Sequence, residues 1–409
     1  MSMSLLTPIG ASYYMRTKSL SPEHYQELMD RGWRRSGSLL YLPDAARSCC
    51  THYTIRLPAA EFRPTKDQRQ ALNRWNDFVL GDQYTKTAAL KYPRTREEKK
   101  RLKSEFDLSL AVHQSESGQL KPDIHPQHRF EVQLESDLFT EEKYALFDNY
   151  QRNVHGEGDD DISRAGFRRF LCGSPLKCRT DAGGKQLGSF HQCYRLDGRL
   201  IAMAVLDLLP HAVSGVYFIY NQDFEAYSFG KLSALREIAL ALERGYKYYY
   251  MGYYIHTCKK MRYKADYKPC LVLDPHSLDW QPLNDELRAL MESRQYASVS
   301  LERERQARGQ HDEPEEVLFP VPLDAMNSGL SVLKLGMPGV LPVSRLQQEI
   351  NLGSMKVSIG REQGLFSAQH IVSWDAGDVS DAKSIKGIFA EVAGAVGPVV
   401  AREAIVDFT

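Results

Sequence analysis

Two acidic residues occupy positions where a carboxylate could take part in chemistry. Asp207 fills a polar gap in the apolar run LIAMAVLDLLP, close to the expected end of a strand, and a buried carboxylate is costly unless it is paired. Asp223 lies in the polar segment NQDFEAYSFGKLS, where it could bind a planar cation through two hydrogen bonds. The alternative for each is an ordinary capping or turn aspartate. We predict that both are functional carboxylates.

Hydroxyl and basic side chains follow in the next segments. Lys231 and Ser233 stand at an expected helix start, where a phosphate or a ribose could bind, although solvated helix starts often look the same. The run YKYYYMGYYI alternates its tyrosines between the two faces of a strand, so about half should fill the core and the rest could line a cleft. Arg262 and Lys264 alternate with less polar residues, which predicts a basic edge on a strand. Phosphate contact and plain solubility are equal alternatives for that edge.

A specific order of elements would position these residues. CYRL, an Asp197-Gly198 turn, LIAMAVLDLLP and VSGVYFIY predict an antiparallel meander. Ser228 to Gly245 then predicts an amphipathic helix, and YKYYYMGYYI a further strand. Meander, helix and strand in this order are typical of acyl-transferase folds. We predict an α/β fold with an acyl-transferase (GNAT-like) mixed sheet flanked by helices.

The remaining segments predict further units. Residues 1–110 carry a surplus of basic over acidic side chains, although the whole chain has 52 Lys plus Arg against 52 Asp plus Glu, so a polycation is excluded. Strands and helices in this part include helices over 21–32 and 66–81, and residues 86–103 predict a mobile loop or a solvated helix. We expect a basic N-terminal α+β domain over 1–125, a transferase domain over 126–300, a charged linker or insertion over 301–318, and a C-terminal segment over 319–409 that packs back.

The compartment is predicted from what the sequence does not contain. No apolar run approaches the roughly 20 residues of a membrane span, and the start MSMSLLTPIG lacks the pattern of a signal peptide. The seven cysteines are odd in number and scattered, as in a reducing compartment. We expect a cytoplasmic protein, with the nucleus as a second compartment.

Many of these segments together resemble one family, the eukaryotic, fungal-like arginyl-tRNA-protein transferases of the N-degron pathway. The resemblance extends over most of residues 20–269. It is carried by MDRGWRRSG (29–37), CC..YTIR (49–56), FRRFLC.SPL (167–176), CY.LDG.LIA..V.D.LP (193–210), VYFIY (216–220), S.GKLSALREIAL (228–240), YYYMGYYIHTC.KM.YKADYKP (248–269) and MPGVLP (337–342).

The resemblance implies a reaction. The free α-amine of a protein that begins with Asp, Glu or oxidised Cys would attack the ester that joins arginine to tRNA, and the product would be marked for degradation. An aminoacyl ester is already activated, so the enzyme must position both substrates, keep the amine neutral and stabilise the oxyanion, and needs no cofactor. The partners implied are arginyl-tRNA, an acidic N-terminal peptide and a ubiquitin ligase, with no membrane. The alternatives are an acyl-CoA N-acyltransferase, which the glycine-poor loop opposes, and a non-catalytic tRNA-binding adaptor.

The resemblance also gives the candidate residues roles. Acidic acceptors demand fixed cations, for which arginine is well suited. We expect catalysis from Asp207, Asp223 and Tyr250, donor and tRNA binding from Lys231, Ser233, Tyr253, Arg262, Lys264, Lys99, Lys100 and Arg101, and acceptor binding from Arg34, Arg35, Arg56 and Arg168.

One departure from the family concerns metal. Members usually carry a Cys-Gly-Tyr-Cys motif that is taken to hold zinc or an iron-sulfur cluster together with paired cysteines. Here no cysteine precedes Cys49, so Cys49 and Cys50 supply two ligands at most of the four that such a site needs. We expect the metal site to be incomplete and the remaining cysteines and His191 to be buried structural residues.

Overall fold

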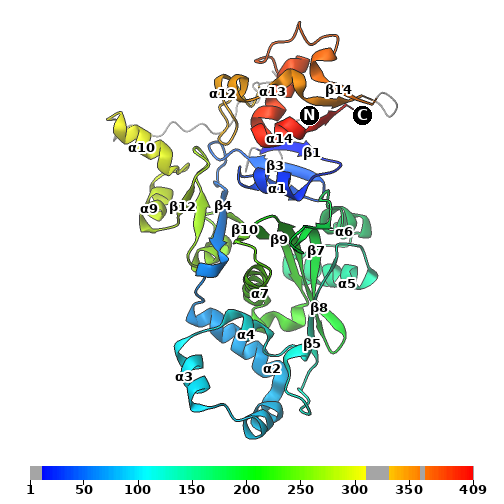
Figure 1. Ribbon diagram of the computed structural model, residues 1–409, viewed down its shortest axis with the longest axis vertical. Coiled ribbons are helices and arrows are strands. Elements are labelled where there is room, and N and C mark those ends of the chain that lie inside the picture. Colours follow the sequence, from blue (N-terminus) through cyan, green and yellow to red (C-terminus); the bar gives the residue numbers. More distant parts are fainter. Residues whose placement is uncertain (1–11, 310–330, 360–363, 409) are drawn as a thin grey trace.

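The computed structural model describes residues 12–309, 331–359 and 364–408 (Figure 1). Its centre is a mixed nine-stranded sheet with the order β12-β11-β4-β10-β9-β8-β7-β5, to which β6 adds by pairing with β7. The pairing of β9 with β10 is parallel, whereas the other neighbours are antiparallel. The strands are β4 (Tyr53–Pro58), β5 (Phe130–Ser136), β6 (Arg179–Thr180), β7 (Gln186–Leu196), β8 (Arg199–Leu209), β9 (Ala212–Tyr220), β10 (Tyr248–Tyr254), β11 (Leu271–Leu273) and β12 (Trp280–Pro282).

The predicted order of meander, helix and strand is confirmed. β7, β8 and β9 form the meander, α7 (Phe229–Glu243) follows, and β10 returns parallel to β9. Asp197 and Gly198 both have positive φ at the β7–β8 turn, which is the backbone conformation that a type I′ hairpin requires. The chain is therefore a mixed α/β protein with a large mixed sheet.

β9 and β10 stay together for only a short distance. Their pairing joins Ala212–Ser214 to Tyr248–Tyr250, and the two strands continue beyond it without pairing to each other. On its other side β10 pairs with β4 through a register shift between Tyr250 and Tyr253, where Gly252 has φ 72°. The sheet thus diverges between two parallel strands, starting at Gly215.

Helices cover both faces of the sheet. On one face, Ala204 and Leu206 of β8 share a core with α7, α2 (Lys66–Lys91) and α4 (Leu108–His113). The alternate residues Met203 and Val205 face the other side and pack against α5 (Glu141–Tyr150) and α6 (Arg164–Leu171). Because side chains of a strand alternate between its two faces, each side chain of β8, including Asp207, faces one of these two sides of the sheet.

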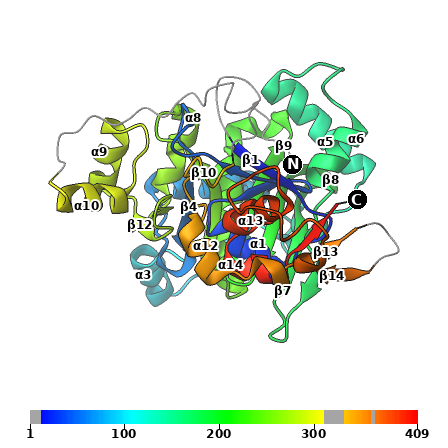
Figure 2. The ribbon, with the colours of Figure 1, turned by 90° about the horizontal axis from the view of Figure 1, so that it is seen from above.

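An N-terminal unit lies against the same face as α5 and α6 (Figures 1 and 2). It contains α1 (Pro22–Met29), capped as predicted by Ser21, which accepts a hydrogen bond from the His24 amide at 3.1 Å. Its three-stranded sheet has the order β1-β3-β2. β4 leaves this unit and joins the main sheet, so that sheet takes strands from both sides of the boundary expected near residue 125. The small strands are β1 (Ser12–Arg16), β2 (Arg34–Ser36) and β3 (Leu39–Pro43).

The helix expected over 66–81 is longer than predicted. α2 continues to Lys91 across a kink at Gly81, whose φ of 75° is non-helical. The segment predicted as a loop or solvated helix over 86–103 then includes α3 (Arg96–Ser104), which begins with a capping box formed by Thr95 and Glu98.

The C-terminal segment shares a core with the N-terminal unit. The indole Nε1 of Trp33 donates to the Ala395 carbonyl at 3.0 Å, and Phe389 lies in the same cluster. α10 extends into the expected linker, whereas residues 310–318 lie outside the described residues. These elements are α9 (Asp285–Ser293), α10 (Val299–Ala307), α12 (Val343–Glu349), α13 (Ile385–Val396), α14 (Pro398–Glu403), β13 (Lys356–Ser358), β14 (Leu365–Ser367) and β15 (Ile405–Asp407).

The strand predicted around Arg262 and Lys264 is wrong. Residues there form α8 (Lys259–Arg262) and a 3-10 turn over Tyr263–Asp266, held by Met261 and Arg262 amides that donate to the Cys258 carbonyl. The chain must cross β4 to reach β11, so β10 cannot continue as a strand. None of the helices in the described ranges is long and apolar enough to cross a membrane.

Candidate functional site

A buried acid, Glu237 of α7, stands where β9 and β10 diverge. A Cβ atom added to Gly215, the first residue of β9 beyond the paired stretch, would meet Glu237 Oε2 at 2.9 Å and the Tyr249 hydroxyl at 3.3 Å. The carboxylate therefore packs directly against the β9 backbone, and only glycine leaves room for it there. Tyr249 comes from the paired part of β10. α7, β9 and β10 together place Glu237 at the point where the two strands part, which we call the apex.

Two hydroxyl groups hold Glu237. Tyr249 donates to Oε2 at 2.6 Å, and Ser233, one helical turn earlier on α7, donates to Oε1. Glu237 is 3% exposed. No Lys, Arg or His in the described part of the chain forms an ion pair with it. Burial therefore raises the pKa of Glu237 to about 7, although both hydroxyl donors oppose the rise.

Aromatic side chains surround this carboxylate. Tyr267 is buried, and its hydroxyl has no hydrogen-bond partner among the described residues. Tyr263 lies edge-on to Tyr267 at 6.4 Å between ring centroids and is 46% exposed. The carboxylate at the apex, whose pKa is about 7, therefore has aromatic neighbours, one of which carries a buried hydroxyl with no acceptor in the described part of the chain.

A second group of polar residues lies on the other side of β10, around Tyr253. Arg34 of β2 places its guanidinium carbon 5.0 Å from the Tyr253 ring centre and donates to the carbonyls of Trp33 (2.6 Å) and Gly252 (3.3 Å). Lys264 Nζ donates to the Tyr253 carbonyl at 2.7 Å. Burial and the Arg34 charge lower the pKa of Lys264 to about 8. We call Arg34 and Lys264 the cation pair.

No acidic residue in the described ranges forms an ion pair with either member of the cation pair. Arg34 is 6% exposed, and its Nε has no hydrogen-bond partner among the described residues. His52 meets the Tyr253 ring edge-on at 5.4 Å, and its buried Nδ1 likewise lacks a partner. A buried positive charge without a counter-charge is costly, so this group is suited to binding an anion.

Asp207, the first predicted carboxylate, differs from Glu237 because an arginine side chain pairs with it. Arg35 Nε donates to Asp207 Oδ2 at 2.7 Å and Arg35 Nη2 to Oδ1 at 2.6 Å, and Nη2 also reaches the Ser189 hydroxyl at 3.0 Å. The side chains of Arg35 and Asp207 are 1% and 0% exposed. The predicted catalytic acid and a predicted acceptor-binding arginine therefore bind each other in a bidentate pair.

Arg56 and Tyr250 also meet. The Arg56 guanidinium carbon lies 3.7 Å from the ring centres of both Tyr248 and Trp280, and Nη1 donates to the Tyr250 hydroxyl at 2.9 Å. Tyr250 in turn donates to Asp30. Arg56 is thus a cation held between two aromatic faces, with an acid within 3.5 Å.

The other predicted residues are dispersed. Asp223 is exposed and pairs with Arg199 at 3.1 Å, and Lys231 pairs with Asp67. Ser233 is occupied by Glu237, so it faces the core and not the helix start. Arg262 donates to the His256 carbonyl.

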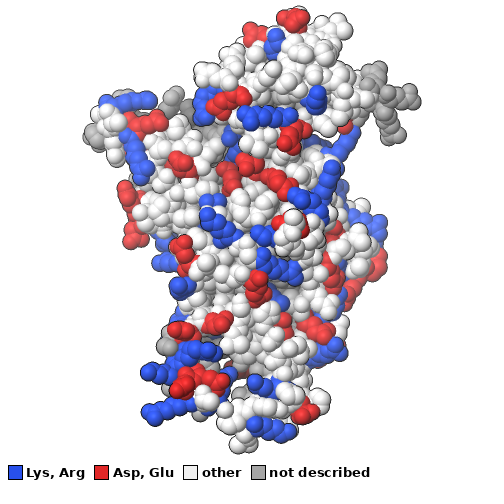
Figure 3. Space-filling view, viewed as in Figure 1, with Lys and Arg blue, Asp and Glu red and all other residues white. Residues whose placement is uncertain are grey.

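Two further predictions fall on helices outside these groups. Arg168 of α6 lies over the Phe139 ring at 4.0 Å, and no described hydrogen bond, ion pair or ring contact joins it to the other three predicted arginines. Lys99, Lys100 and Arg101 belong to α3. Figure 3 shows acidic and basic side chains intermixed at the lower left, where Figure 1 places α3.

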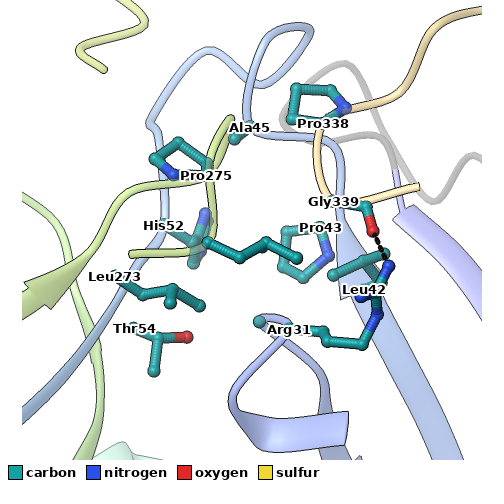
Figure 4. Close-up of a pocket in the computed structure, with 12 residues that line it drawn as sticks. Arg31, Leu42, Pro43, Ala45, His52, Thr54, Leu273, Pro275, Pro338 and Gly339 are labelled. Carbon is teal, nitrogen blue, oxygen red and sulfur yellow. Dashed lines mark hydrogen bonds between the residues drawn. The ribbon is translucent and has the colours of Figure 1, made fainter. Parts of the chain in front are cut away.

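A small cavity of about 30 Å³ lies where the N-terminal unit, the main sheet and the C-terminal segment meet (Figure 4). Arg31 points into it and donates through Nη2 to the Gly339 carbonyl at 2.7 Å. His52 and Thr54 line the opposite side. The volume is enough for about two water molecules.

The described residues do not form a site that fits the zinc ion or iron-sulfur cluster that the sequence resemblance implies. Cys49 is exposed and Cys50 is partly buried. No group of three or more Cys, His, Asp or Glu side chains among the described residues is arranged to hold a metal ion. Two adjacent thiols do not fit a four-ligand zinc or cluster site.

Two protein-family models match the parts of the chain that contain Glu237 and the cation pair. A family model described as the N terminus of arginine-tRNA-protein transferase matches residues 8–70, and one described as the C terminus matches residues 142–274. The first range contains Arg34, and the second contains Glu237 and Lys264. The chain belongs to the arginyl-tRNA-protein transferase family. α3 lies outside both matched ranges.

Similar proteins include arginyl-tRNA–protein transferases and aspartate/glutamate leucyltransferases. Arginyl-tRNA–protein transferase 1 of Saccharomyces cerevisiae is 34% identical over 262 residues, which are 59% of this chain and 47% of the yeast protein. The Arabidopsis thaliana protein of the same name is 25% identical over 71% of this chain and 72% of its own length. An aspartate/glutamate leucyltransferase of Pseudomonas putida is 32% identical over 61% of this chain and 79% of its own length. The chain thus spans about half the length of its yeast relative.

Comparison with solved structures adds little. The structure of L-PGS from Bacillus licheniformis has a TM-score of 0.27 at 9% identity, covering 50% of this chain and 46% of that one. A score this low carries no argument about fold.

Sequence reasoning missed Glu237 as a candidate. The segment FGKLSALREIALALE was expected to be a helix with Leu232, Leu235, Ile238, Ala239 and Leu242 on one face. Glu237 directly precedes Ile238 and is four residues after Ser233, so a charged residue on the buried side of the helix was the available signal. Arg236 and Glu243 in the same helix made that signal ambiguous.

Proposed function

We propose that the chain transfers an amino acid, arginine, from charged tRNA to the free α-amine of proteins with an acidic N-terminal residue. The observation that carries the proposal is membership of the arginyl-tRNA-protein transferase family through both of its matched regions. The cation pair supports the acceptor class, because an Asp or Glu side chain would supply the negative charge that Arg34 and Lys264 lack. In this proposal the acyl donor enters the gap between β9 and β10.

The reaction requires mainly that the protein position both substrates and transfer a proton. The amine attacks the ester carbonyl, the oxyanion collapses, and the tRNA ribose hydroxyl leaves. Such a reaction needs no metal or redox group, and we propose that none takes part. The order of meander, helix and diverging strand supports an acyl-transferase (GNAT-like) fold, which we propose as the fold type. We further propose a cytoplasmic location.

Leucine is the second candidate for the transferred residue, because the Pseudomonas relatives are named leucyltransferases. The two donors differ in the side chain that the site must accept, a planar cation or a branched apolar group. Asp223 was predicted to bind the guanidinium, but it already pairs with Arg199 at the surface.

A donor panel tests the proposal. The chain is mixed with arginyl-tRNA, leucyl-tRNA or acyl-CoA, and with peptides that begin with Asp or Asn but are otherwise identical. We expect product from arginyl-tRNA and the Asp peptide. If product forms from leucyl-tRNA alone, the transferred residue is leucine and not arginine. If product forms from acyl-CoA alone, aminoacyl transfer is refuted. Binding of tRNA without product from any donor would indicate an adaptor.

A further inference from the structure

Glu237 has the surroundings of a reactive group and lacks those of a structural ion pair. Buried carboxylates are normally paired with a cation. Asp207 shows this in the same protein, where two hydrogen bonds from Arg35 compensate its charge. Among the described residues, the groups that donate hydrogen bonds to Glu237 are the neutral hydroxyls of Ser233 and Tyr249. The two buried acids therefore differ in whether their charge is compensated.

Glu237 lies at the point where the pairing of β9 with β10 ends. Its Oε2 lies against Gly215, the first residue of β9 that no longer pairs with β10. Tyr267 adds a buried hydroxyl that has no hydrogen-bond partner among the described residues. The Glu237 carboxylate thus lies at the point where β9 and β10 part.

We propose that Glu237 is the proton acceptor for the incoming α-amine. The inference rests on the proposed aminoacyl transfer. The amine nitrogen forms a bond to the ester carbonyl carbon, one N–H proton passes to a Glu237 carboxylate oxygen, and the C–O bond to the ribose breaks. The same proton then passes from Glu237 to the departing ribose oxygen, so the carboxylate is regenerated and the charges balance.

The surroundings fit this role. A general base works best when its pKa lies near the working pH, and burial raises the pKa of Glu237 to about 7. Ser233 and Tyr249 fix the orientation of both carboxylate oxygens and partly offset the effect of burial. The competing interpretation is that Ser233, Glu237 and Tyr249 only fasten α7 to β10.

Two variants separate these interpretations. Glu237→Gln keeps the shape and an acceptor oxygen but cannot take up a proton. Tyr249→Phe keeps the carboxylate and removes one donor that favours its charged form, so the pKa of Glu237 should rise further. The readout is kcat across pH 5.5–9 for an Asp peptide and charged tRNA, with KM measured separately and folding monitored by circular dichroism.

The proposal predicts a distinct pattern. Glu237→Gln should lower kcat by about 10²- to 10⁴-fold with KM changed by less than about threefold, and Tyr249→Phe should move the rising limb of the kcat profile to higher pH. A Glu237→Gln protein that is folded and retains kcat within about threefold would overturn the proposal. If Glu237→Gln fails to fold, Tyr249→Phe decides, because a purely structural contact would leave the midpoint of the profile unchanged. No product from the unaltered chain would instead refute the proposed function.

Discussion

Replacing Asp207 by asparagine tests whether this residue is a structural or a catalytic acid. The change removes the charge that compensates Arg35, whose side chain is 1% exposed, and keeps the size of the side chain. Breaking one partner of a buried ion pair typically costs about 3–5 kcal/mol, because the other charge remains buried without compensation. We therefore expect Asp207→Asn to lower the free energy of unfolding by about this amount.

The matched control removes both charges. Arg35→Met combined with Asp207→Leu leaves no uncompensated charge, so its cost should be well below the sum of the two single changes, with a coupling of about 2 kcal/mol or more. Urea denaturation monitored by circular dichroism gives the unfolding free energy of each protein. A cost below about 1 kcal/mol for Asp207→Asn, together with complete loss of transfer, would refute the structural role and restore Asp207 as a catalytic residue.

Three other predictions follow from the charges of the described groups. The pKa of Glu237 rises from 4.5 to about 7 on folding, so the folded protein binds this proton more tightly and loses stability as pH rises between those values. Between pH 5.5 and 8.5 the free energy of unfolding should fall by about 2 kcal/mol, and the Glu237→Gln protein should not show this fall. If the urea midpoints of both proteins depend equally on pH, the raised pKa of Glu237 is contradicted. Arg34→Ala and Lys264→Ala should each reduce the kcat/KM preference for Asp over Asn peptides by about tenfold, because a charge-assisted hydrogen bond is removed, whereas Arg168→Ala should leave the preference unchanged. Reversing the charges of Lys99, Lys100 and Arg101 should weaken tRNA binding. The slope of log K against log salt concentration should become shallower by about 0.9 for each phosphate that these side chains no longer neutralise. An unaltered slope would show that α3 does not contact tRNA.

The fold was predictable where local sequence patterns decide it. The meander, its Asp197-Gly198 turn, and α7 followed from apolar periodicity and turn residues, and Ser21 correctly marked the start of α1. The strand predicted around Lys264 failed because tertiary connectivity decides there: the chain must turn away from β10 to reach β11. Alternation along four residues could not reveal that constraint.

The candidate site was harder to predict, because its residues come from distant parts of the chain. Asp207 and Arg35 were separately identified as unusual, but only the structure shows that they satisfy each other. Arg34 and Lys264 were assigned to different substrates, yet both lie beside Tyr253. Glu237 is significant only because Gly215 leaves space for its carboxylate where the strands part.

The most direct test of the central claim is the site of the new bond. The chain is incubated with arginyl-tRNA and a peptide that begins with Asp, and the product is sequenced by fragmentation in a mass spectrometer. A peptide that is identical except for an acetylated N-terminus serves as the control. We predict one arginine added to the α-amine of the free peptide and none added to the acetylated peptide. An unmodified free peptide, or arginine added to the acetylated one, would contradict the proposed function.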